Sequence, residues 1–153
     1  ENSPKFYFES CEYEDDFLFI HFLQKIILNP LDKTNLNELL YRWEEILEGD
    51  SSGYFDVCRG LLTNDSFEFE KSFSSFISYR DQQIVEYKKE PLHDSNLIAA
   101  EGYLSVEGIG ILNIAKWLGL EIKRTYRMIP EDLISTMETG TSGYLNWKVM
   151  KQS

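Results

Sequence analysis

The stretch that most constrains the fold runs from Glu101 to Leu120, EGYLSVEGIGILNIAKWLGL. Ser105 is a favourable N-cap, Gly119 can end a helix in the left-handed conformation, and nearly every residue between them is apolar. A helix that is apolar around most of its circumference has to be surrounded by other elements. Its two internal glycines, Gly108 and Gly110, each cost about 1 kcal/mol relative to alanine, so we expect another backbone to pass close to that turn.

Five further segments carry helical signals around this predicted central helix, which spans about 105–118. Their apolar residues recur at spacings of three and four, or a capping residue precedes them. They cover about 15–28, 35–48, 53–64, 65–90 and 130–138. With 153 residues and 42% hydrophobic content, the chain can bury a substantial core. We therefore predict an all-α single domain over 1–153, with about six helices arranged as helical hairpins.

Other parts of the chain show weaker patterns. Residues 121–128 are predicted to be extended, and a polar connection precedes the predicted central helix. The chain begins with Glu1 rather than Met, so we expect it to be a trimmed part of a longer protein.

The net charge of −11 is unevenly distributed along the chain. Residues 1–70 hold 16 acidic and 5 basic residues, a net charge of −11, whereas residues 71–153 hold 10 of each. This imbalance argues against direct binding to nucleic acid or to an anionic membrane and favours a basic partner. The alternative is that the acidic residues only keep the surface solvated.

Two acidic clusters are the predicted partner-binding residues. One closes the predicted helix 35–48 and the other lies near the start of the first helix, and together they comprise Glu44, Glu45, Glu48, Asp50, Glu12 and Glu14. Carboxylates near a helix C-terminus oppose the helix dipole, so the first cluster does not help its own helix to fold. Selection for a basic partner and a merely solvated face both remain open as explanations.

No pattern in the sequence indicates catalysis. The two histidines, His21 and His93, have no partner at a metal-ligand spacing, and the two cysteines, Cys11 and Cys58, form neither a metal motif nor a disulfide framework. We therefore expect no catalytic residue, no bound metal and no cofactor. Since no apolar run is long enough to span a membrane, and free thiols are compatible with a reducing compartment, we expect a cytoplasmic protein.

Three strings resemble one known family: LLTNDSFEFEKSFSSFI, EGYLSVEGIGILNIAKWLGLEIK and YRMIPEDLI. The region from Leu36 to Ile134 looks like the C-terminal part of an all-α family of immunity proteins from bacterial polymorphic toxin systems. In that family a short hairpin turn leads into a long helix, followed by a capped apolar helix and an extended link. The matching positions are Leu62, Asp65, Leu104, Ser105, Gly119, Pro130 and Leu133.

The resemblance implies a protein that binds one cognate toxin and blocks it without catalysis. It implies no particular binding residues, because the matching positions are caps and core positions. An acidic surface suits a nuclease toxin, whose basic substrate groove it can occlude. The alternatives are a helical scaffold or regulatory module with another basic partner, and an enzyme that uses His93 or the acidic clusters.

Overall fold

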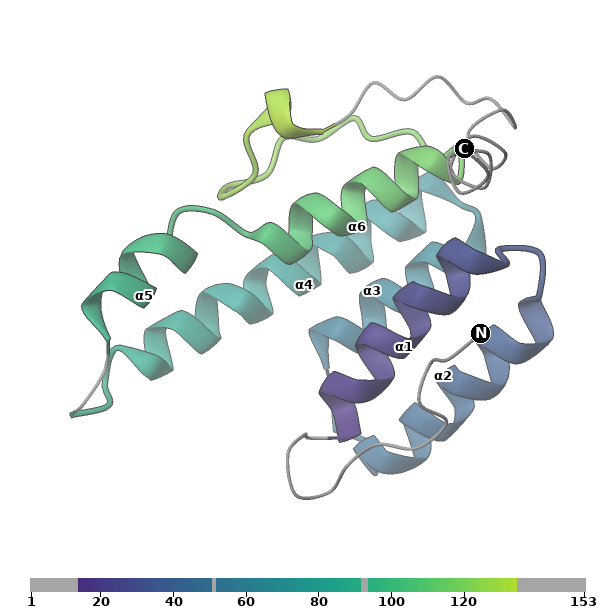
Figure 1. The fold of residues 1–153 in the computed structure, drawn as a ribbon, viewed down its shortest axis with the longest axis horizontal. Coiled ribbons are helices and arrows are strands. Elements are labelled where there is room, and N and C mark those ends of the chain that lie inside the picture. The colour runs from purple at the N-terminus through teal and green to yellow at the C-terminus, as the bar shows by residue number, and fades with distance from the viewer. Residues whose placement is uncertain (1–13, 51, 92–93, 135–153) are drawn as a thin grey trace, which may run out of the picture.

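A computed structural model describes residues 14–50, 52–91 and 94–134 (Figure 1). Its elements are α1 (Glu14–Leu28), α2 (Lys33–Leu47), α3 (Gly53–Thr63), α4 (Ser66–Tyr87), α5 (Ser95–Glu101), α6 (Val106–Trp117) and a 3-10 helix, η1 (Glu131–Leu133). Strands are absent from these residues, and a single isolated bridge joins Tyr126 to Ile129. The predicted all-α class is confirmed.

α1 and α2 form an antiparallel hairpin with apolar inner faces. Leu18, Phe22 and Ile26 of α1 are at most 1% exposed, and Trp43 of α2 is fully buried. α2 begins earlier than predicted because its N-cap is Asp32, whose carboxylate accepts a hydrogen bond from the Asn35 amide at 3.2 Å. It ends where Glu48 takes the left-handed conformation, with φ of 49°.

α3 is the innermost helix. It packs against α4, α1 and α2, and seven of its eleven residues are buried. Two glycines allow it to lie very close to α4. A methyl group on Gly53 would lie 2.7 Å from Cβ of Tyr79, and one on Gly60 would lie 2.0 Å from Oγ of Ser72. A methyl group on Gly53 would therefore clash with the base of the Tyr79 side chain, and one on Gly60 would displace the Ser72 hydroxyl, so the two glycines favour the close α3–α4 contact.

α6 is not the central helix that the sequence predicts. It lies along one side of α4 (Figure 1), and its buried residues are Gly108, Ile111, Leu112 and Ala115. Val106 is 71% exposed, and a methyl group on Gly110 would meet nothing within 4 Å. The predicted close approach of another backbone is wrong at both glycines, because a methyl group on Gly108 would instead meet side-chain atoms, with Cδ1 of Ile129 at 2.8 Å. The apolar composition of α6 therefore led to a prediction of greater burial than the structure shows.

The connection before α6 contains α5, a helix that the sequence analysis treats as a polar loop. Asp94 caps α5 by accepting a hydrogen bond from the Asn96 amide at 2.8 Å. The predicted final helix over 130–138 is also different, because its described part forms only the short η1, and Ile134 is already extended. Residues 135–138 lie outside the described part of the chain.

The segment after α6 returns along α4 without forming a helix, as predicted for 121–128. Glu70 of α4 is only 7% exposed, and its carboxylate accepts hydrogen bonds from the amides of Lys123 (2.6 Å) and Arg124 (2.9 Å). Tyr126 packs edge-on against Phe73, with ring centroids 4.6 Å apart. One buried carboxylate thus holds this segment on the outside of α4.

Candidate partner-binding surface

The structure brings carboxylates of α1 and α2 together at one end of their hairpin. Glu14 forms an ion pair with Arg42, so the first turn of α1 lies beside the last turns of α2 (Figure 1). We call residues 14–16 and 44–50 the acidic end. Its seven carboxylates are Glu14, Asp15, Asp16, Glu44, Glu45, Glu48 and Asp50.

The predicted partner-binding residues differ in how accessible they are. Glu44, Glu45, Glu48 and Asp50 are exposed. Glu14 is largely covered, with 22% of its side chain exposed, and its charge is opposed by Arg42. Glu12 lies outside the described residues. Among the predicted residues, those that a partner can reach are therefore the four carboxylates in and directly after the last turn of α2.

Asp15, which the sequence analysis did not single out as a partner residue, anchors the acidic end to the core. Its carboxylate accepts hydrogen bonds from the Trp43 indole and from Ser52, the N-cap residue of α3. Burial raises the pKa of the Asp15 carboxyl; the bond from Trp43 opposes this shift, and the charge of Asp16 adds to it. One carboxylate therefore joins α1, α2 and the start of α3.

A groove runs along the outer face of α4, and the sequence analysis did not predict it. We call it the α4 groove; it has a volume of about 580 Å³ and is open to solvent. Three α4 serines line it: Ser74, Ser75 and Ser78. Their hydroxyls donate to backbone carbonyls of α4 itself, at 2.7, 3.4 and 3.0 Å. Because these hydroxyls already donate to backbone carbonyls, a partner does not have to satisfy them. The small serine side chains also leave the floor of the groove shallow and unobstructed.

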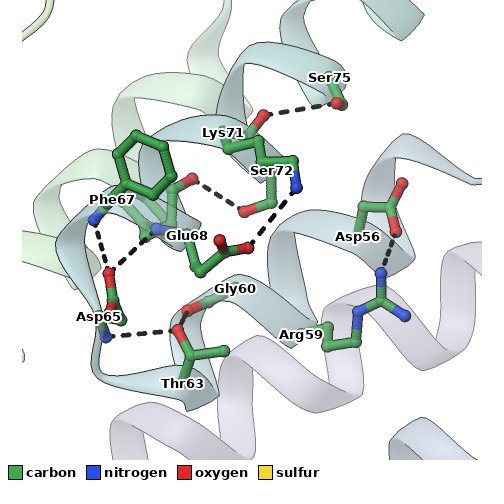
Figure 2. Close-up of polar contacts among 11 residues, drawn as sticks. Asp56, Arg59, Gly60, Thr63, Asp65, Phe67, Glu68, Lys71, Ser72 and Ser75 are labelled. Atoms are coloured by element: carbon green, nitrogen blue, oxygen red, sulfur yellow. Dashed lines mark hydrogen bonds and ion pairs between the residues drawn. The ribbon is translucent and has the colours of Figure 1, made fainter.

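The first turn of α4 sets one end of the α4 groove. Figure 2 shows the Asp65 carboxylate receiving hydrogen bonds from the amides of Phe67 (2.8 Å) and Glu68 (3.1 Å), which confirms the predicted cap. The capped turn presents Phe67 to the groove with its side chain 66% exposed. An exposed aromatic ring in a groove is typical of a protein contact surface.

The charged residues along the α4 groove are paired. Asp56 forms an ion pair with Arg59 at 3.0 Å, and Lys71 with Glu68 at 3.8 Å (Figure 2). On the other side, Arg124 lies 3.7 Å from the Glu70 carboxylate. The groove is therefore close to electrically neutral, in contrast to the acidic end.

The remaining candidates from the sequence have structural surroundings. His21 stacks on Phe17 with ring centroids 5.4 Å apart, and burial lowers its pKa. Cys58 is fully buried, and burial raises the pKa of its thiol well above the ordinary value. His93 and Cys11 lie outside the described residues. Within residues 14–50, 52–91 and 94–134, no group of three His, Cys, Asp or Glu side chains could hold a metal ion.

Comparison with known proteins produced no match to a family model, a curated protein or a solved structure. The likeness to immunity proteins therefore stays a prediction from the sequence, as does the cytoplasmic location. Among the described helices, none has the length and apolarity needed to cross a membrane.

Proposed function

We propose that this chain is an immunity protein that binds a cognate bacterial toxin, a nuclease, and neutralises it by stoichiometric occlusion. The observation that carries this proposal is the acidic end, where exposed carboxylates in and directly after the last turn of α2 lie beside the start of α1. The resemblance of residues 36–134 to an immunity-protein family supports the same class.

The placement of Glu44, Glu45 and Glu48 supports a binding role for them. They lie in the last turn of α2 and directly after it, where the helix dipole is negative and carboxylates are mildly unfavourable. Glu14, Asp15 and Asp16 lie in the first turn of α1, where the dipole favours them. Apart from the hydrogen bond that Glu45 accepts from the Tyr41 hydroxyl, the first group has no evident benefit for folding, and a basic partner supplies a physical reason for it.

The chemistry of the partner follows from the charge. A nuclease binds a polyanion and so presents a basic groove, which an acidic surface can fill in place of the substrate. Complementary charge also accelerates association. The Asp15 anchor fixes the acidic end against the core, so little ordering is needed on binding.

The first test is co-purification with the protein encoded immediately upstream of this gene, prepared as an inactive variant. We expect a one-to-one complex, and we expect the chain to protect cells that express the active upstream protein. A harmless upstream protein, combined with binding to a different basic protein, would favour the scaffold alternative.

A second test changes only the charge. The triple variant Glu44→Gln, Glu45→Gln, Glu48→Gln should melt at the parent temperature or slightly above it. Its association with the toxin should slow by about tenfold at low salt, with a weaker salt dependence. Glu131→Gln with Asp132→Asn is the matched control, since both residues are exposed acids away from the acidic end. An unaltered rate and salt dependence for the triple variant would rule out the acidic end as the contact.

A further inference from the structure

The α4 groove begins near the acidic end, because Gly53 lines it and lies three residues after Asp50. Tyr79 lines the groove beside Gly53, where a methyl group would lie 2.7 Å from the Tyr79 Cβ. Gly53 also follows Ser52, the residue that binds the Asp15 carboxylate. A partner that covers the acidic end therefore meets the groove at its Tyr79 end.

The surroundings of the two ends of the α4 groove differ in charge. The Tyr79 end adjoins the acidic end through Gly53, whereas the charges toward the Phe67 end are balanced, since Lys71 pairs with Glu68 and Arg124 with Glu70. A bound helix places its positive N-terminus and negative C-terminus in such a field most favourably when its N-terminus faces the carboxylates. The charge gradient thus suits a helix that runs antiparallel to α4.

The dimensions of the α4 groove also suit a helix. The lining residues extend along α4 from Phe67 to Gln82, which at 1.5 Å per residue corresponds to about 22 Å, or about four helical turns. The small side chains of Ser74, Ser75 and Ser78 permit close approach of a second helix, and Phe67 offers an apolar contact at the far end.

We propose that the α4 groove receives a helix of the same toxin whose basic surface covers the acidic end. This inference rests on the proposed function and adds a second, uncharged contact to it. The acidic end steers the toxin, and the groove holds it, so the two surfaces affect different rate constants.

The test fills the groove without changing charge. Ser78 is an exposed groove residue, and Ser78→Trp places a large side chain in the path of the helix. Ser95→Trp, at an exposed position in the first turn of α5, is the matched control. Against the inactive upstream toxin, we expect Ser78→Trp to raise Kd by at least about tenfold through faster dissociation, and Ser95→Trp to change it by less than about twofold. Melting curves verify that both variants fold.

A second variant removes an apolar side chain from the groove, whereas Ser78→Trp adds a large one. Phe67→Ala should weaken binding by at least about fivefold and leave its salt dependence unchanged, whereas Tyr103→Ala, at another exposed aromatic residue, should have little effect. If the parent chain binds and the triple Gln variant associates slowly, but Ser78→Trp and Phe67→Ala bind like the parent, the groove inference is wrong and the proposed function stands. If the parent does not bind the upstream protein, both fail.

Discussion

α3 and α6 are helices of similar length that lie at different depths in the molecule. Seven of the eleven residues of α3 are buried, compared with four of the twelve residues of α6. α6 is nevertheless the more apolar of the two. The difference shows that the depth of a helix depends on how closely its neighbours can approach, as well as on its apolar content.

Close approach explains the position of α3. Its glycines, Gly53 and Gly60, face α4. Its aromatic residues contact all three neighbours: Phe55 packs on Trp43 of α2, and Tyr54 packs on Phe19 of α1 and Phe76 of α4. In α6, by contrast, a methyl group on Gly108 would meet the side chains of Ile129 and of Ser105, the N-cap residue of α6, and Val106 is exposed. Both proposed binding surfaces adjoin the start of α3: its N-cap residue Ser52 interacts with Asp15 of the acidic end, and Gly53 lines the α4 groove.

The largest expected difference between the two regions concerns their tryptophans. Trp43, which packs on Phe55 of α3, is fully buried, and Trp43→Ala should lower the free energy of unfolding by about 3–5 kcal/mol. Trp117 of α6 is only partly buried, so Trp117→Ala should cost less than about 2 kcal/mol. Chemical denaturation measures both values. Equal losses would mean that α6 is as central as α3.

A smaller loss is expected at the α3–α4 contact. Gly60→Ala gains at most about 1 kcal/mol in helix propensity but forces Ser72 away from the new methyl group, at a cost of about 1–3 kcal/mol. Thermal melting should therefore show a destabilised protein. A more stable Gly60→Ala variant would show that the Ser72 hydroxyl moves aside without cost, and that the close contact does not depend on glycine at this position.

The glycines of α6 allow a comparison within a single helix. Gly110→Ala should stabilise the protein by up to about 1 kcal/mol, because the position is helical and open. Gly108→Ala should destabilise it, because the methyl group would approach Ile129 and the Ser105 hydroxyl. The same melting experiment serves for both, and effects of equal sign would contradict the one-sided burial of α6.

The smallest expected effect is pH-dependent and lies at Asp15. The pKa of this carboxyl is higher in the folded protein than its ordinary value of 3.8, so the folded state binds the proton more tightly than the unfolded state. Its contribution to stability is therefore fully present below pH 3.8 and is lost as the pH rises through the folded-state pKa. Asp15→Asn should be slightly more stable than the parent at pH 7, with the difference shrinking as the pH falls. A difference that grows on acidification would contradict the buried anchor.

The local signals in the sequence predicted the helices well. The Asp65 cap, the Ser105 cap and the apolar spacing of α1 to α4 depend on neighbouring residues, and the structure confirms them. α5 was missed because seven residues carry little periodicity. The central position of α3 was missed because the contacts of Gly53 and Gly60 are with residues of another helix, which periodicity does not identify.

The candidate partner-binding surface, like the fold, could be predicted only in those parts that depend on local sequence. Exposure of Glu44, Glu45 and Glu48 followed from their place at a helix end. The burial of Asp15 did not, because its partners Trp43 and Ser52 are distant in the sequence. The sequence contains one indication of the α4 groove: Phe67 is an aromatic residue outside the apolar stripe of α4. This indication can be interpreted only when the positions of α3 and residues 121–125 are known.

Native-state hydrogen exchange tests most directly the claim that α3 is the rigid centre of the fold, which both proposed binding surfaces adjoin. Amides of α3 and of the middle of α4 should exchange only through global unfolding, with a free energy equal to that from denaturation, whereas α6 should exchange through a smaller opening. Equal, global protection of α6 and lower protection of α3 would contradict this account.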